Sequence, residues 1–376
     1  MVITEKTSRT LMVANLVAII MIIAIHYSTS EYALVNGTIW GWNYLTQEFL
    51  TNGLARSAVP YFALISGFFL FSQFSVHRSY SKLLSSRCYS LLVPYLLAAT
   101  IIFLSIAFAK LLRGNTSFLN IKTVFQGIFI TPLSGQFWFL RDLCILVVIS
   151  PLLLPKSRLL QYTLGLVLFL LWLVNLQIMP ILGVWYLINM ETLFFFYLGG
   201  QLSYRSEFLN SMVNSSAKLT AFTSLLLIVV LMTRIKIDPT IDVWYITVKK
   251  YTYLSLFLYK TTIVIGIMAL IQISALFHHN NRLIHISGLT FFAFLFHLAP
   301  LKFLLSMLSD VIVPKDFGFY VSFPIATVTV FAIAHLMAAY MPRLYGILCG
   351  GRNPNKAFNR TQPHRHDDGP VSPKYP

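Results

Sequence analysis

A histidine inside the first apolar stretch of the chain has the clearest potential for chemistry. His26 lies near the end of a run from 11 to 28 that is otherwise almost entirely apolar. An ionisable side chain in a bilayer costs free energy unless it faces a cavity or a partner, so it marks a functional site by default. A neutral imidazole can take a proton from a hydroxyl near pH 7. The alternative is that His26 is half solvated at the membrane interface.

Asn15 shares a helical face with this histidine. Eleven residues separate the two in the sequence, which on an α-helix corresponds to about 20° of rotation and roughly 16 Å of rise. Arg9 falls about 100° off that face. We therefore expect Asn15, and not Arg9, to share a polar site with His26.

Further polar side chains fall inside later apolar stretches. If the N-terminus is cytoplasmic, those of three later spans lie at a depth similar to that of His26, in the outer half of the membrane. This clustering predicts a polar cavity that opens outward. The candidates for its lining and for catalysis are Ser66, Trp138, Arg141, Asp142, Glu191 and His297.

Each candidate also has a structural interpretation. The adjacent Arg141 and Asp142 project about 100° apart on a helix and could pair with different neighbouring helices. Glu191 could pair with Arg141 for packing alone. His297 could hydrogen-bond a backbone carbonyl and do nothing more. Ser66, next to a glycine, could serve close helix packing, because small residues let helices approach.

The elements that must position these residues are membrane-spanning helices. The chain is 57% hydrophobic and only 11% charged, with a mean hydropathy of +0.73. A soluble domain carries about twice that charged fraction. The ten-residue alternation of a β-barrel is absent. The composition therefore predicts an all-α, polytopic membrane protein, because helices satisfy every backbone polar group within lipid.

We expect about ten spans in a domain over 1–345, followed by a disordered cytoplasmic tail over 346–376. The excess of Lys and Arg on one side modestly favours cytoplasmic N- and C-termini. The tail is rich in Pro, Asn, His and charge and lacks an apolar face to bury. The predicted spans are 11–28, 54–73, 90–109, 137–154, 159–177, 186–204, 218–233, 261–277, 286–307 and 319–341.

The net charge of +16 and the three cysteines exclude several classes of protein. The basic residues are scattered among loops and do not form one face, so we expect contact with anionic lipid headgroups and no nucleic-acid partner. The cysteines are odd in number and lack CxxC spacing, which indicates neither a disulfide framework nor a metal site.

A predicted cytoplasmic loop carries a basic cluster, Arg78, Lys82 and Arg87, ahead of Val93-Pro94-Tyr95. Most clusters of this kind control topology or contact lipid. Three such charges could equally hold the phosphates of an anionic cytosolic cofactor. The sequence leaves both possibilities open.

The order of these pieces resembles the acyltransferase 3 family, the multi-span bacterial enzymes that O-acetylate lipopolysaccharide O-antigen, exopolysaccharide or related glycans. The similarity extends from about residue 9 to 341. It rests on AIIMIIAIHYS at 18–28, VPYFALISGFFLF at 59–71, RCYSLLVPYLL at 87–97, QFWFLRDL at 136–143, FFFYLGGQLSYR at 194–205 and AFLFHLAPL at 293–301.

The resemblance implies a site and a reaction. His26 corresponds to the histidine taken as catalytic in the family, and Arg78, Lys82 and Arg87 belong to the basic loop linked to the acyl donor. The family usually has an arginine eleven residues before the histidine, where this chain has Asn15. In the implied chemistry, His26 removes the proton of a sugar hydroxyl as that hydroxyl attacks the thioester, or it first carries the acyl group itself as an acyl-histidine. Arg141 or a backbone N–H would stabilise the oxyanion.

The sequence therefore predicts an inner-membrane O-acyltransferase. Its donor would be acetyl-CoA and its acceptor a lipid-linked or surface polysaccharide such as O-antigen, with His26, Arg141 and Asp142 as catalytic candidates. Two other classes of protein fit the same polar cavity and basic loops: a transporter or flippase for lipid-linked glycans, and a multi-span glycan polymerase. Dependence on acyl-CoA separates the enzyme from the transporter.

Overall fold

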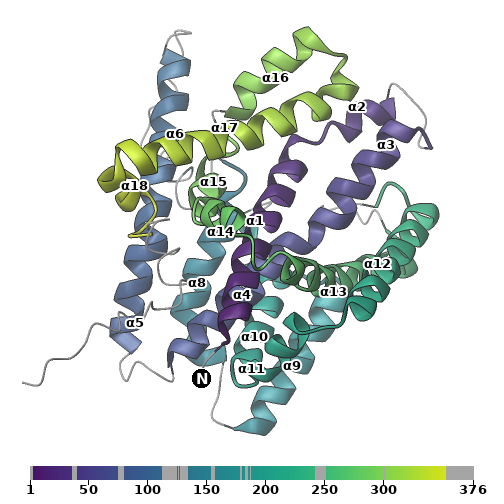
Figure 1. Cartoon of the computed structure of the whole chain (residues 1–376), viewed down its shortest axis with the longest axis vertical. Coiled ribbons are helices and arrows are strands. Elements are labelled where there is room, and N and C mark those ends of the chain that lie inside the picture. Colours follow the sequence, from purple (N-terminus) through teal and green to yellow (C-terminus); the bar gives the residue numbers. More distant parts are fainter. Residues whose placement is uncertain are drawn as a thin grey trace, which may run out of the picture.

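The computed structural model is a bundle of helices surrounding the first one (Figure 1). It describes residues 3–35, 40–74, 80–111, 125, 127, 134–153, 157–177, 180–182, 185–186, 188–241, 251–299 and 301–352. Apart from one short antiparallel hairpin, β1 (Pro180–Leu182) with β2 (Trp185–Tyr186), the elements in these ranges are helical. The prediction of an all-α, polytopic membrane protein is confirmed.

The helices of the first half are α1 (Glu5–Tyr27), α2 (Ser30–Val35), α3 (Trp42–Gln47), the π-helix η1 (Glu48–Gly53), the 3₁₀-helix η2 (Leu54–Ser57), α4 (Ala58–Phe74), α5 (Tyr80–Arg87), the π-helix η3 (Cys88–Leu92), α6 (Val93–Leu111), α8 (Phe137–Leu153) and α9 (Arg158–Leu173). Those of the second half are α10 (Met190–Ser203), α11 (Ser206–Val213), α12 (Ala217–Ile237), α13 (Tyr253–Leu276), α14 (Asn281–Ser287), α15 (Thr290–Phe296), α16 (Leu301–Ile312), the 3₁₀-helix η6 (Lys315–Phe317), α17 (Gly318–Tyr340) and α18 (Pro342–Leu348).

Six of the described helical segments are long and apolar enough to cross a membrane, so the predicted count of ten is not confirmed. They are Glu5–Tyr27, Trp42–Phe74, Tyr80–Phe108, Ala217–Ile237, Tyr253–Leu276 and Lys315–Tyr340. A helical span needs about 20 residues. The predicted spans 137–154, 159–177 and 186–204 correspond to α8, α9 and α10, which have 17, 16 and 14 residues.

The predicted span at 286–307 was wrong as a single helix. The chain there forms α14, α15 and α16, with breaks at Gly288, the C-cap of α14, and at His297, the C-cap of α15. Apolar composition alone does not distinguish one long helix from several short ones. The break matters because it places His297 at the end of a helix, where its backbone carbonyl is free to accept a bond from elsewhere.

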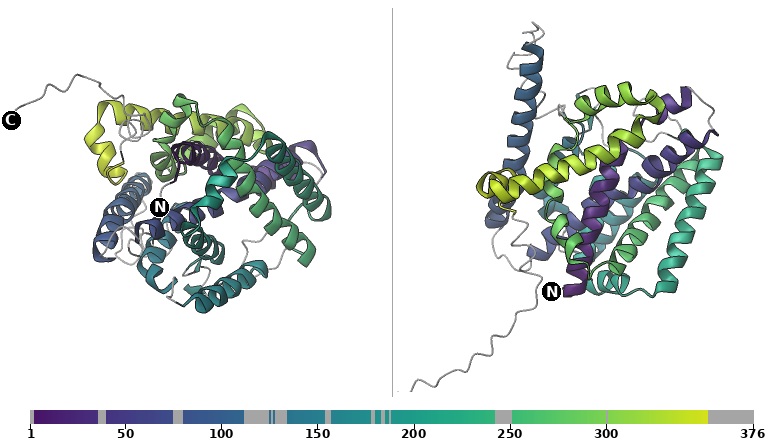
Figure 2. Two further views of the ribbon diagram at one scale, coloured as in Figure 1. Left: turned by 60° about the horizontal axis from the view of Figure 1, so that its bottom comes forward. Right: turned by 45° about the horizontal axis from the view of Figure 1, so that its top comes forward.

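Helix α1 is enclosed by the rest of the bundle (Figure 2) and packs against α4, α13, α14, α15 and α17. It begins with a side-chain cap, because Thr4 accepts a hydrogen bond from the N–H of Thr7. Buried residues lie all around it, as expected for a helix that is apolar on every side. The polar side chains of α1 therefore point into the protein and not into lipid.

Helices α4 and α10 cross at very short distance because glycines lie at the contact. A Cβ built at Gly67 would overlap the carbonyl oxygen of Phe196, and one at Gly199 would overlap that of Leu64. Small residues at such crossings let two backbones approach. Gly67 therefore serves close packing, and its neighbour Ser66 is left to face a cavity between the helices.

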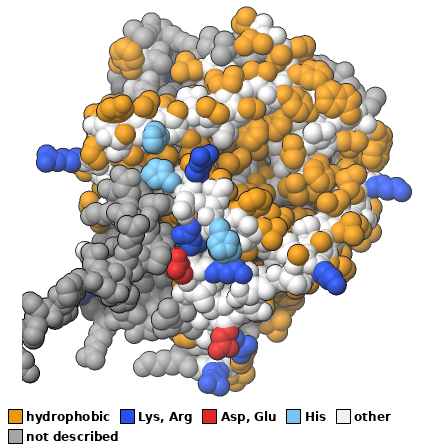
Figure 3. Space-filling view, viewed as in Figure 1, with side chains coloured by type: hydrophobic (Ala, Val, Ile, Leu, Met, Phe, Trp, Pro, Cys, Tyr) orange, Lys and Arg blue, Asp and Glu red, His pale blue; other side chains and the backbone are white. Residues whose placement is uncertain are grey.

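Apolar side chains cover much of the outer surface (Figure 3). The exposed ones include Leu159, Leu160 and Leu166 on α9, Phe222, Leu225 and Val229 on α12, and Val328 and Leu336 on α17. Their contact with lipid tails accounts for this exposure, since a soluble monomer rarely leaves so large an apolar area uncovered.

The carboxy-terminal chain is ordered further than the sequence predicts. Helix α18 packs against α17 and α6, and Cys349, just after it, is fully buried. Residues 346–352 of the predicted disordered tail are therefore ordered, and residues 353–376 lie outside the described part of the chain. Composition missed this because the packed residues are few and adjoin a polar run.

Candidate active site

His26 and His297 come together at the end of α1 that is opposite to its start. Their ring centroids are 5.2 Å apart, with the ring planes inclined at 44°. Tyr27 Oη donates a hydrogen bond of 2.8 Å to the backbone carbonyl of His297. That bond uses the carbonyl left free at the end of α15. The broken helix and α1 thus fix the two imidazoles next to each other.

The hydrogen bonds of His297 define its tautomer. Its Nδ1 lies 3.0 Å from the carbonyl oxygen of Ala293 and 2.9 Å from that of Phe294. Carbonyl oxygens only accept, so Nδ1 carries a proton and, in the neutral ring, Nε2 is an acceptor. Nε2 is buried and has no hydrogen-bond partner among the described residues. His297 therefore offers an unused acceptor beside the ring of His26.

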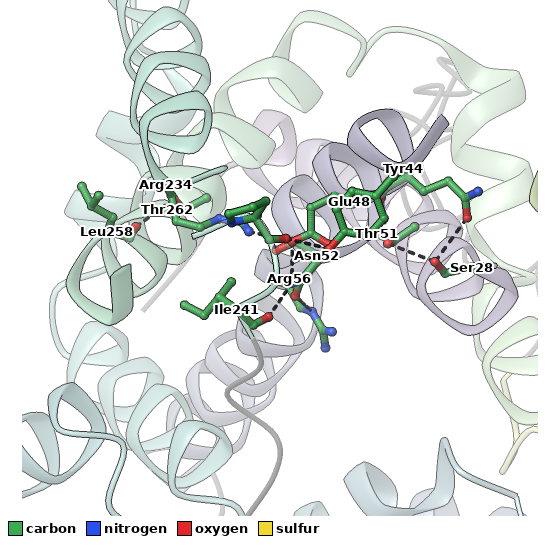
Figure 4. Close-up of polar contacts among 12 residues, drawn as sticks. Ser28, Tyr44, Glu48, Thr51, Asn52, Arg56, Arg234, Ile241, Leu258 and Thr262 are labelled. Carbon is green, nitrogen blue, oxygen red and sulfur yellow. Dashed lines mark hydrogen bonds and ion pairs between the residues drawn. The ribbon is translucent and has the colours of Figure 1, made fainter. Parts of the chain in front are cut away.

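A row of polar contacts on the π-helix η1 lies beside this end of α1 (Figure 4). Arg234 forms a buried ion pair with Glu48 at 2.6 Å. Asn52 donates to the same carboxylate at 2.7 Å and accepts from Nε of Arg56 at 2.9 Å. Arg56 in turn interacts electrostatically with His26. π-Helical turns are frequent at functional sites, and this one brings a cation toward the histidine pair.

A cavity of about 670 Å³ lies between the helices, next to the first half of α1, where Met12 and Asn15 line it. Its walls come from α1, α4, α5, η3, α8, α10, α14, α15 and the chain after α18. The volume is in the range of small-molecule and cofactor sites. Most of its wall is apolar, with a few polar side chains.

Arg87 and Arg352 both line the cavity and interact electrostatically, which makes this end of it basic. Asn15 of α1 and Ser66 of α4 also line it, whereas neither His26 nor His297 does. His26 is three helical turns, roughly 16 Å, beyond Asn15 on the continuous helix α1. Phe294 of α15 also lines the cavity, so one wall ends about one turn from His297.

The structure places Asn15 on the cavity wall, where its Oδ1 accepts a hydrogen bond of 3.0 Å from Tyr61 Oη. Asn15 and His26 lie on one uninterrupted helix, as expected, but Asn15 lines the cavity and His26 does not, so a polar site shared by the two stays a prediction. Arg9, predicted to be off that face, donates to the carbonyl of His278 and to Asn281 near the start of α14.

Arg141 and Asp142 bind each other, and Asp142 also binds the start of α10. Arg141 Nη2 donates to Asp142 Oδ1 at 2.9 Å, and the other oxygen of Asp142 accepts the backbone N–H of Asn189 at 2.8 Å. Asn189 caps α10 with its side chain. Asp142 is therefore fully engaged in holding α8 to α10. Trp138, one turn earlier, packs against Phe139.

Glu191 pairs with a residue that the sequence analysis missed. Lys260 Nζ lies 3.1 Å from Glu191 Oε2, and Trp172 Nε1 donates to the same oxygen at 3.0 Å. The packing alternative considered for Glu191 named Arg141 as its partner, and that partner was wrong. Lys260 was overlooked because the predicted span began at 261, whereas α13 begins at Tyr253 and carries Lys260 well inside the helix.

The three basic candidates differ in position. Arg87 lines the cavity, while Lys82 is exposed and does not line it. Arg78 lies outside the described residues. Arg352, at the same end of the cavity as Arg87, was missed because it follows the predicted domain boundary. In the parts of the chain that the structure describes, no group of three or more His, Cys, Asp or Glu could hold a metal ion.

The comparison with known families decides the class of this protein. A sequence model for an acyltransferase domain, that of acyltransferase 3, matches residues 14–339. The chain belongs to the acyltransferase 3 family. It is a membrane acyltransferase, and the matched region includes both histidines. No curated protein and no solved structure matches the chain.

Proposed function

We propose that this acyltransferase carries acetyl from acetyl-CoA to a hydroxyl group of a lipid-linked or surface polysaccharide, of which O-antigen is the leading candidate. It would act in the bacterial inner membrane with both termini in the cytoplasm. The proposal rests on the family and on two features of the structure: a cavity that two arginines, Arg87 and Arg352, help to line, and a pair of adjacent histidines on helices α1 and α15 that also contribute to its wall. This arrangement suits a donor that enters from the cytoplasm and an acceptor on the other side.

The cavity suits the donor in shape and charge. Coenzyme A has a phosphate-bearing head and a long, flexible pantetheine arm that ends in the thioester. The arginines would hold the head, and the arm would pass Asn15 and Ser66 toward the histidines. Arg87 is the best placed of the three basic candidates, because it lines the cavity. Lys82, which is exposed and does not line the cavity, would contribute only to long-range attraction.

His26 would act as the general base. The acceptor hydroxyl gives its proton to a ring nitrogen of His26 while its oxygen bonds to the acetyl carbon. The C–S bond then breaks, and the thiolate of coenzyme A takes the proton from the imidazolium. General-base assistance contributes about 10²–10⁴ in rate. His297 would position His26, since its Nε2 can accept the N–H of a neighbouring imidazole and leave the other nitrogen free.

The negative charge on the thioester oxygen needs a donor. Arg56 and Lys302 both interact electrostatically with His26, so they are candidate cations for this task. Arg141 directs Nε and Nη2 at Asp142. We therefore assign Arg141 and Asp142 to holding the catalytic helices in place.

Mass spectrometry of the surface glycan tests the proposal. A host that carries the acceptor would express the wild type, His26→Ala or an empty vector. An acetyl-sized increment with the wild type alone would support both the reaction and the histidine. An increment that survives in His26→Ala would reject the mechanism. If the wild type leaves the glycan unchanged and also binds no acyl-CoA, the transporter is favoured.

A further inference from the structure

The carboxy-terminal residues after α18 form one wall of the cavity, although they lie beyond the stretch 14–339 that matches the family. Gly350 and Gly351 turn the chain with φ of +62° and +79°, values that favour glycine. A Cβ at Gly350 would be 2.8 Å from the backbone Cα and O of Ser90. The two glycines therefore bring the next residue, Arg352, against η3.

Arg352 is held in place by groups that carry no negative charge. Its Nη1 donates to the carbonyl oxygen of Ser90 at 2.6 Å and to that of Cys349 at 2.9 Å. An α-helix would pair the Ser90 carbonyl with the N–H of residue 94, but Pro94 has none. The guanidinium also lies 3.8 Å from the centre of the Phe291 ring. These contacts orient the side chain without neutralising it.

Arg87 is a second cation at the same end of the cavity. Its Nη2 donates to Gln73 Oε1 at 2.8 Å, and its Nε is buried without a hydrogen-bond partner in the described structure. Of the carboxylates in the described ranges, none forms an ion pair with Arg87 or with Arg352.

Two neighbouring, half-buried cations without an acid are unfavourable in the free protein. Burial lowers the pKa of Arg352 to about 10, and the nearby positive charge of Arg87 contributes to this decrease. The guanidinium still carries its charge at pH 7. Partial removal of two like charges from water without a counter-charge costs free energy. A bound anion would remove that cost, and phosphate groups match the fork of guanidinium donors.

We propose that Arg352 and Arg87 together form a phosphate-binding site on the wall of the cavity, built in part by the carboxy-terminal segment. The identification of its ligand as the phosphate-bearing head of acyl-CoA rests on the proposed function. The site itself requires only a phosphate or diphosphate group that reaches the cavity from the side of the membrane where α1 begins.

Binding of coenzyme A to the full chain in phosphatidylcholine nanodiscs tests this site. We expect Arg352→Gln and Arg87→Gln each to raise the Kd at least about tenfold, since each loses a charge-assisted interaction. Arg343→Gln removes the same charge from an exposed position of α18 and should bind as the wild type does. Pantetheine, which has no phosphate, should bind equally to all four proteins.

Gly350→Ala tests the same site a second time without changing any charged residue. Its Cβ would push the turn away from Ser90 and displace Arg352, so coenzyme A should bind more weakly in a protein that still elutes as the folded species. Unchanged affinity in Arg352→Gln, or a parallel loss of pantetheine binding, would overturn the site. Phosphatidylglycerol in the nanodiscs separates the two sources of phosphate: binding of phosphatidylglycerol that depends on Arg352, together with binding of coenzyme A that does not, would assign the site to lipid headgroups and overturn the donor assignment.

Inorganic pyrophosphate separates failure of this inference from failure of the proposed function. Arg352-dependent binding of pyrophosphate without binding of coenzyme A would support the anion site and reject the donor. If the wild type acetylates the glycan and Arg352→Gln does so equally at low donor concentration, the function stands and the anion site falls. A wild type that binds neither compound would overturn the anion site.

Discussion

Tyr27 fastens His297 beside His26 through a hydrogen bond to the backbone and leaves both imidazoles free of it. The side chain of His297 uses Nδ1 on two carbonyls of its own helix and keeps Nε2 unused. Hydrogen bonds therefore fix the ring of His297, whereas the ring of His26 is positioned by packing, including its contact with His297. That division suits a positioning residue and a base.

Replacement of His297 should slow the reaction without weakening the binding of the acyl donor. We expect His297→Ala to lower kcat about tenfold to a hundredfold with an unchanged KM for acyl-CoA, because His26 loses an acceptor that orients it. Tyr27→Phe removes only the 2.8 Å hydrogen bond and should cost about 1 kcal/mol of stability. Steady-state kinetics in nanodiscs measures both. A rise in KM with constant kcat in His297→Ala would contradict the positioning role.

The sequence predicted the class and the single first helix that carries Asn15 and His26, because these depend on local composition and helical periodicity. It did not predict that His297 ends a short helix, since an apolar stretch gives little sign of a break. The pairing of Glu191 with Lys260 and the return of Arg352 to the cavity are contacts between distant segments. Such contacts depend on how helices pack, and no spacing within one helix reveals them.

The buried pair of Glu191 and Lys260 should be tested as a unit. The side chains are 11% and 3% exposed, so removal of one partner leaves a charge without compensation. We expect Lys260→Met alone to destabilise the protein by ~3–5 kcal/mol, and Lys260→Met with Glu191→Gln to recover most of that loss. Chemical unfolding in mixed micelles gives the free energies. Additive losses in the double variant would show that the two residues do not stabilise each other.

The glycine contact between α4 and α10 should be intolerant of a single methyl group. In Gly67→Ala the new Cβ meets the backbone oxygen of Phe196, which cannot turn aside as a flexible side chain would. We expect a loss of more than about 2 kcal/mol or failure to fold. Gly346→Ala is the matched control, because open space surrounds that position in α18 and alanine favours a helix. Equal melting temperatures for the two variants would exclude close packing at Gly67.

Asn15→Arg tests whether the cavity accepts the charge that the family usually has at this position. The side chain already lines the cavity and accepts a bond from Tyr61 Oη, which also lies 3.3 Å from the carbonyl of Leu11 and so keeps a partner. We expect activity equal to or above that of the wild type, with a lower KM for acyl-CoA, because a cation in the cavity attracts an anionic donor. Asn15→Leu, which fills similar space without charge, should not lower KM. A folded Asn15→Arg protein without activity would show that this cavity wall has adapted to the neutral side chain, and that the position no longer corresponds to that of the family in function.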